Sequence, residues 1–208
     1  MNYQLVLEEE LKKINGVPKL LLHVCCAPCS SYVLEYLSNY FYITVFYYNP
    51  NIDTIDEYRK RMEESKRFTK EFNGKYPVTF VEIGHHNDIY QHVIEGFENE
   101  KEGGARCFKC YRLRLEKTFM YAKEHDYDYV TTTLTISPLK NSKKINEIGH
   151  ELSKVYNLKY LYSDFKKKEG YKRSIVLSRE YNLYRQNYCG CKYSKRIEVK
   201  DLEKVESN

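Results

Sequence analysis

The feature that most constrains this chain is the apolar run at residues 20–24, which stops at two adjacent cysteines, Cys25 and Cys26. Cys29 follows, and the serines at positions 30 and 31 are suited to cap a helix that begins there. A short apolar run that ends in a turn and a capped helix is typical of a buried strand feeding a βα loop. In an open parallel sheet this loop lies at the carboxyl edge, where ligands bind. The pattern therefore predicts that the three thiols are ligands.

Strands and helices alternate along the rest of the chain. Strands are predicted at residues 19–24, 42–48, 77–83, 129–136 and 158–162. Helices are predicted at residues 2–14, 30–39, 53–72, 87–97, 105–126, 141–157 and 171–184. This alternation indicates βαβ units with right-handed crossovers. We therefore expect an α/β fold with a five-stranded parallel sheet in the order 3-2-1-4-5, in which the loops after the first and fourth strands flank the ligand site.

The length of 208 residues predicts a single α/β domain. It comprises an N-terminal helix in residues 1–18, a sheet core in residues 19–165 and a helical, cysteine-bearing C-terminal extension in residues 166–208. The first residues are too acidic for a signal peptide, and no segment approaches a transmembrane span. We therefore expect a cytoplasmic protein without membrane contact, in a reducing setting where disulfides are not expected.

All seven cysteines fall into three groups. These groups are Cys25, Cys26 and Cys29, then Cys107 and Cys110, and then Cys189 and Cys191. Cysteines used only as small buried hydrophobes would not gather at turns with spacings of one to three. Cys107 and Cys110 are spaced i, i+3 near a predicted helix start, so both sulfurs face the same side. The amino end of a helix also favours thiolate over thiol. Gly190 between the last two cysteines lets the backbone wrap closely.

The number of thiols bears on the kind of metal. Seven is one short of two closed zinc sites with four ligands each. Four thiolates for a [4Fe–4S] cluster and three for a second, open metal position fit the number better. Adjacent Cys25 and Cys26 are not expected to turn both sulfurs to one ion, but they could present one sulfur to each of two neighbouring centres. The residues alone indicate a redox iron–sulfur protein.

Five motifs in combination resemble the QueH family of epoxyqueuosine reductases. They are HVCCAP at 23–28, YNPNI at 48–52, RCFKCYR at 106–112, ISP at 136–138 and YRQNYCGC at 184–191. The resemblance runs from about residue 19 to residue 195. It implies a Rossmann-like sheet of the adenine nucleotide alpha hydrolase-like type and a [4Fe–4S] cluster beside a mononuclear iron. It also implies reduction of epoxyqueuosine to queuosine at the tRNA wobble position, the last step of queuosine biosynthesis, without cobalamin.

Residue by residue, the resemblance assigns six cysteines to the cofactor. They are Cys25, Cys26, Cys107, Cys110, Cys189 and Cys191. Cys29 occupies a position that holds aspartate in some members of the family. It either ligates the second metal or sits nearby.

The implied reaction removes an epoxide oxygen and needs two electrons and two protons. The expected partners are therefore an external electron donor and tRNA carrying epoxyqueuosine. Lys140, Asp164 and His23 are candidate proton donors because of their positions in loops near the site. For His23, inside an apolar strand, a hydrogen-bonded core histidine is the stronger interpretation.

Basic residues gather near the cysteine motifs and predict a tRNA-binding surface. The RNA-binding candidates are Arg112, Lys172, Arg173, Arg185 and Lys192, within a wider basic set that includes Arg106 and Arg114. Tyrosines interleave with them and could stack on an unpaired anticodon base. The net charge of +5 does not by itself indicate nucleic acid. A run of basic residues is about as often a solvated face as a nucleic-acid-binding surface.

Two other classes of protein remain as alternatives. An adenylating tRNA sulfur transferase would need a glycine-rich phosphate loop after the first strand, and this loop reads CCAPC. A zinc-binding RNA adaptor would use the same cysteines without redox chemistry. Colour separates the two kinds of metal protein, because zinc thiolates are colourless and iron–sulfur proteins are brown.

Overall fold

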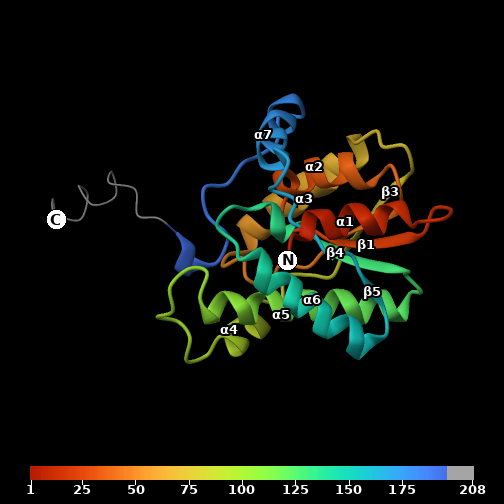
Figure 1. Ribbon diagram of the computed structural model, residues 1–208. Helices are drawn as coiled ribbons and strands as arrows, with labels where there is room; N and C mark the ends of the chain where they lie inside the picture. The colour runs from red at the N-terminus through yellow and green to blue at the C-terminus, as the bar shows by residue number, and fades with distance from the viewer. Residues whose placement is uncertain (196–208) are drawn as a thin grey trace, which may run out of the picture.

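Five parallel strands form one sheet in the order β3-β2-β1-β4-β5 in the computed structural model, which describes residues 1–195 (Figure 1). The strands are β1 (Lys19–His23), β2 (Tyr42–Tyr47), β3 (Val78–Glu82), β4 (Tyr129–Thr132) and β5 (Lys159–Tyr160). In the central strand, Leu22 is in register with Val45 of β2 and Thr131 of β4. The predicted α/β class and strand order are confirmed. The part of the predicted C-terminal extension from residue 196 onward lies outside the described residues.

Helices connect the strands and cover both faces of the sheet. They are α1 (Tyr3–Lys12), α2 (Ala27–Leu37), α3 (Ile55–Glu71), α4 (Asn87–Val93), α5 (Ala105–Glu124), α6 (Ser142–Tyr156) and α7 (Gly170–Glu180), with 3-10 turns η1 (Thr133–Ile136) and η2 (Lys192–Ser194). Local sequence sets several of the helix starts. Asn141, for example, caps α6 by accepting the Lys144 N–H at 3.0 Å. No helix within residues 1–195 is long and apolar enough to cross a membrane.

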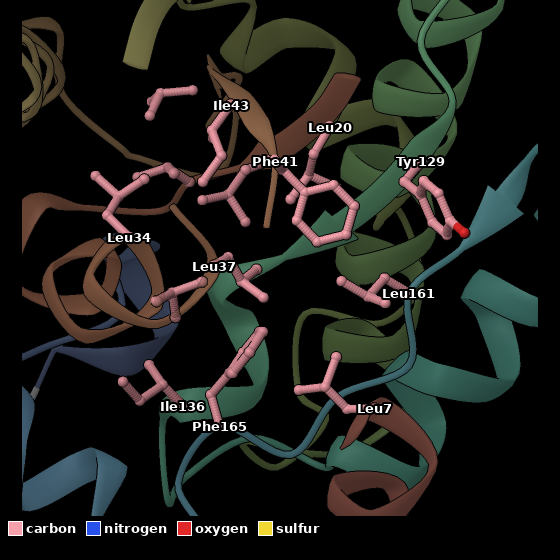
Figure 2. Packing of buried hydrophobic residues seen from close by; sticks show 14 of the residues in the cluster. Leu7, Leu20, Leu34, Leu37, Phe41, Ile43, Tyr129, Ile136, Leu161 and Phe165 are labelled. Atoms are coloured by element: carbon pink, nitrogen blue, oxygen red, sulfur yellow. The ribbon is translucent and has the colours of Figure 1, made fainter. Parts of the chain in front are cut away.

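The core has two halves because successive residues of β1 point to opposite faces of the sheet. Leu20 and Leu22 pack with α1 and α2, and Figure 2 shows this half of the core, which includes Leu34 and Leu37 of α2. Leu21 packs on the other face with apolar residues of α5 and α6. In Figure 1, α2 and α7 lie on one side of the strands and α5 and α6 on the other. The side chain of His23 therefore points to the face of the sheet that α5 covers.

Helix α2 begins three residues earlier than predicted. Pro28 suits the first helical turn because its fixed φ is already helical. Ser30 and Ser31 do not cap the helix, and their hydroxyls instead donate to the carbonyls of Ala27 and Pro28 at 2.9 Å. Cys29 consequently lies within the first turn of α2 rather than in the loop before it.

Strand β4 is shorter than predicted, because the chain turns into η1 after Thr132. The Thr132 hydroxyl accepts the Leu134 N–H at 3.1 Å, a local bond that competes with the strand ladder. Helices α4 and α7 also end a few residues before their predicted ends, and β5 has only two residues. The early turn after β4 places Thr133 beside Cys25, where its hydroxyl accepts the Cys25 N–H at 3.3 Å.

Candidate metal centre

Cys25, Cys26 and Cys29 form the first thiol group, at the carboxyl end of β1. Their sulfurs all lie within 4.8 Å of one another, and the Sγ atoms of Cys25 and Cys26 are 3.8 Å apart. The prediction that these two neighbours do not turn both sulfurs to one ion is wrong, because the chain bends at Cys25 and cancels the alternation of an extended strand. Thiolates bound to one tetrahedral ion at about 2.3 Å lie about 3.8 Å apart. The first thiol group therefore fits a single metal ion.

Hydrogen bonding concentrates negative charge on one sulfur of the first thiol group. Thiol hydrogen bonds from Cys26 and then Cys29 lower the pKa of Cys25 well below its usual range. The hydrogen bond between Cys26 and Cys25 raises the pKa of Cys26 to about 12. The hydrogen bond between Cys29 and Cys25 raises the pKa of Cys29. Metal binding at this group would therefore displace the protons that Cys26 and Cys29 hold.

Cys107, Cys110, Cys189 and Cys191 form the second thiol group. Two come from the start of α5 and two from the C-terminal segment, and all four line one small cavity. Within residues 1–195, no three of these sulfurs lie within 4.8 Å of one another, unlike those of the first group. This wider spacing suits ligands that each bind a different iron of a cubane cluster rather than four ligands around one ion.

Burial governs the protonation of the α5 thiols. It raises the pKa of Cys110 to about 12, with the neighbouring Arg114 opposing this shift. Burial also raises the pKa of Cys107, although the Gly103 N–H donates to its sulfur at 3.2 Å. The prediction that thiolate is favoured at this helix start is wrong for the metal-free chain, because desolvation of the charged form raises the pKa of both cysteines.

The segment that carries the last two cysteines, residues 184–194, is called the C-terminal strap, and it is held against α3. The Tyr184 N–H donates to Glu64 Oε1 at 2.7 Å, and the Asp53 N–H donates to the Gly190 carbonyl at 3.0 Å. Buried Arg61 donates from Nη1 to the Cys189 carbonyl at 3.2 Å. These bonds fix the backbone on both sides of Cys189 and so position the second thiol group.

Gly190 is required where the C-terminal strap meets α3. Its φ is +114°, a left-handed conformation that side chains rarely adopt. A Cβ at this position would lie 3.0 Å from both Arg61 Nη1 and Ile52 Cγ1. The glycine thus permits the close approach of backbone to α3, in agreement with the role predicted for it.

The two thiol groups meet at one rim of the sheet. A cavity of about 400 Å³ is lined by the whole first group and by Cys189, between the loop after η1 and the C-terminal strap. Glu102, Leu139, Lys140 and Cys189 line this cavity and also the small cavity of the second group. In Figure 1 the loop before α5 and the blue end of the strap lie together at the left of the sheet. The expected convergence of the three cysteine clusters is confirmed.

Buried polar atoms without a partner gather around the cysteines. Within residues 1–195, three such atoms belong to residues that line the cavities. Asn51 Oδ1 and Arg106 Nε make no hydrogen bond at the small cavity, and Gln186 Oε1 makes none at the large cavity. Arg61 Nη2 and Tyr47 Oη are also unpaired, and both side chains interact electrostatically with Cys26. A buried donor such as Arg106 Nε–H is costly without an acceptor. Sulfide and thiolate sulfurs are the acceptors that a metal centre would bring.

Of the three candidate proton donors, only Lys140 lies at the metal centre. Burial lowers its pKa, but the thiolates of Cys189 and Cys25 outweigh this and raise the pKa above its usual value. Asp164 lines neither cavity and instead accepts from Lys166 Nζ at 2.5 Å.

His23 is a core histidine. It is fully buried, and burial, followed by the charge of Arg114, lowers its pKa to about 3. Its Nε2 accepts from Arg114 Nε at 3.2 Å, so its Nδ1–H donates to Thr132 Oγ1 at 2.8 Å. The stronger of the two sequence interpretations of this residue therefore agrees with the structure.

The predicted RNA-binding residues occupy different places. Exposed Arg185 lines the large cavity, while exposed Lys192 lies over the Tyr193 ring at 5.1 Å. The other three are engaged with acids: Arg112 with Glu151, Lys172 with Glu169, and Arg173 with Glu35 and Glu180. Arg106 and Arg114, from the wider basic set, are buried and so are removed from a tRNA-facing surface.

Sequence reasoning missed several residues that line the large cavity. Glu102 precedes a glycine pair in a loop, where no periodic pattern marks it. Ser174 comes from α7, beside Tyr171, which was among the tyrosines expected to stack on a base, and Gln186 lies within the YRQNYCGC motif. That motif was a usable signal for Gln186, because a polar residue so close to two ligating cysteines shares their location.

Comparison with known proteins agrees with the motifs. The family described as "Epoxyqueuosine reductase QueH" matches residues 20–197. A protein of that name from Streptococcus pyogenes serotype M1 is 45% identical, over 100% of this chain and 84% of the relative. The protein of that name from Haemophilus influenzae is 38% identical, over 91% of this chain and 77% of the relative. The protein of that name from Thermotoga maritima is 32% identical, over 84% of this chain and 89% of the relative.

Proposed function

The chain belongs to the QueH family of epoxyqueuosine reductases, and from this we propose that its seven cysteines hold two metal centres that serve the reduction of epoxyqueuosine. The chain is an oxidoreductase of queuosine biosynthesis. Its proposed substrate is epoxyqueuosine at the wobble position of a tRNA, and its proposed product is queuosine. An external electron donor completes the reaction, and no cobalamin takes part.

The difference in sulfur spacing between the two thiol groups carries this proposal. The compact first group, with Sγ atoms 3.8 Å apart at Cys25 and Cys26, would hold the mononuclear iron and leave it an open position. The wider second group would hold the [4Fe–4S] cluster. Unpaired Arg106 Nε supports this fit, because cluster sulfides accept hydrogen bonds. Cys189 lines both cavities, which supports two adjacent centres.

When bound, the iron centres would supply electrons and a Lewis acid toward the epoxide oxygen. Conversion of the epoxide to an alkene consumes two electrons and two protons and releases the oxygen as water. We assign to Lys140 a hydrogen bond to the departing oxygen, and its position in the lining of both cavities supports this role. Exposed Glu102 faces the same cavity and is placed to carry protons from solvent.

The large cavity is proposed to receive the modified nucleoside. Its volume of about 400 Å³ lies within the usual range of small-molecule sites. Leu139, more than half exposed, and Pro138 give it an apolar side, whereas Ser137, Asn187 and Arg185 give it polar groups. A nucleoside leaves its stack to enter such a pocket, and exposed basic residues at the rim then contact the tRNA backbone.

The metal content tests the proposal directly. Protein prepared without oxygen should be brown and contain inorganic sulfide together with more iron than the four atoms of one cluster. Colourless protein that contains only zinc would reject the assignment of both centres.

The tRNA of cells that lack the gene tests the substrate. We expect epoxyqueuosine to accumulate there and queuosine to return when the gene is restored. Cells with unchanged queuosine would show that another protein carries out the reaction.

A further inference from the structure

Arg114 is a buried cation without an acidic partner, next to the second thiol group. It lies one turn after Cys110 on α5 and is 1% exposed. Its Nε donates to His23 Nε2 at 3.2 Å, and its Nη2 donates to Asn49 Oδ1. Neither acceptor balances its charge, because an amide is neutral and an imidazole that accepts at Nε2 carries its proton only at Nδ1.

Lys140 is a second cation of this kind, at the junction of the two cavities. It is only partly exposed, and neither Lys140 nor Arg114 forms an ion pair with any acid among residues 1–195. The ionisable groups that attract Arg114 most are Cys110, Cys25 and Cys189, and those that attract Lys140 most are Cys189, Cys25 and Cys29. Both cations thus face thiols from both groups.

A buried charge without a counter-ion destabilises the folded chain. Metal binding turns the cysteines into thiolates and makes the whole site anionic. Arg114 and Lys140, which pair with no acid among residues 1–195, therefore lie where this negative charge would form.

We propose that Arg114 and Lys140 offset the negative charge of the metal–thiolate centre and so raise its reduction potential. This inference rests on the proposed function. Each electron that the cluster takes from the external one-electron reductant adds one negative charge, and nearby positive charge lowers the cost of that addition. The two residues act through the cluster and are positioning residues in this role, whatever else Lys140 contributes to the substrate.

The test compares variants in the anaerobically prepared holoenzyme. Iron and sulfide content is measured first, and the midpoint potential of the cluster is then obtained from a dithionite titration followed by electron paramagnetic resonance. Arg114→Gln and Lys140→Gln remove one charge each, and Arg114→Lys keeps it. Lys123→Gln removes the same charge from an exposed position near the far end of the same helix.

We expect the reduction equilibrium to shift at least tenfold toward the oxidised cluster in Arg114→Gln and in Lys140→Gln, about 59 mV for a one-electron couple. Arg114→Lys and Lys123→Gln should stay close to the wild-type potential. Should Arg114→Gln fail to fold, Lys140→Gln decides the question, because Lys140 lies at a cavity rim. Fully loaded variants with unchanged potentials would overturn the inference and leave the proposed function standing. Wild-type protein without iron and sulfide would overturn both.

Discussion

The two thiol groups are built in different ways. The first comes from five consecutive positions at the end of the central strand, so the sheet and the start of α2 are enough to form it. The second needs the start of α5 and the C-terminal strap, which meet only because Arg61 and Glu64 bind the strap to α3. The compact group is therefore a property of the core, whereas the wider group depends on tertiary docking and is the easier one to lose.

Removal of one proposed ligand from each thiol group should have the largest effect. Cys110→Ser should lose nearly all inorganic sulfide and lower reductase activity roughly a thousandfold or more, equivalent to about 4 kcal/mol of barrier. Cys29→Ser should keep the sulfide and the visible absorbance but lose iron in excess of the cluster. Equal loss of sulfide in both variants would contradict the division into two centres.

A change at the docking contact should separate the groups without touching a thiol. Arg61→Met removes the bond to the Cys189 carbonyl and leaves Glu57, its 2.6 Å partner, without its cation. We expect the free energy of unfolding to fall by about 3 kcal/mol and the sulfide content to fall with it. Arg59→Met is the matched control, because Arg59 is exposed on the same helix, so about 0.5 kcal/mol or less is expected. Urea unfolding measures both, and equal losses would remove the special role of Arg61.

The close approach at Gly190 gives a smaller effect. Gly190→Ala should cost about 2 kcal/mol, because it combines a positive φ with Cβ contacts at 3.0 Å to Arg61 and Ile52. Gly16→Ala has a positive φ of +75° but open space around the Cβ, so about 1 kcal/mol is expected. Only Gly190→Ala should also lower the sulfide content. A variant that keeps full sulfide would show that the strap tolerates displacement.

The smallest effect concerns tRNA affinity at the cavity rim. Arg185→Gln should weaken tRNA binding about fivefold, roughly 1 kcal/mol, and reduce its dependence on salt. Arg112→Gln should have less effect, because Arg112 is already engaged with Glu151 away from both cavities. Binding titrations at two salt concentrations measure both variants. A larger effect at Arg112 would place the tRNA on the α5–α6 face instead.

The sheet order and the meeting of the cysteines were predictable, because alternating strands and helices permit few topologies and ligands follow strand ends. The bend at Cys25 was not predictable, since it depends on the backbone angles of a single residue. The burial of Arg114 was hidden by its residue type, because an arginine among other basic residues resembles a surface position. Glu102 was missed because a loop side chain gains its role only from the segments that fold against it.

The separation of the second thiol group along the chain has a consequence for synthesis. A ribosome releases the N-terminal part of a protein first, so the first thiol group and the sheet around it exist well before Cys189 and Cys191 leave the exit tunnel. The proposed cluster could therefore be inserted only after Cys189 and Cys191 have left the tunnel. A nascent chain stalled before the strap should take up one metal ion and no sulfide, so the order of synthesis separates the loading of the two proposed centres.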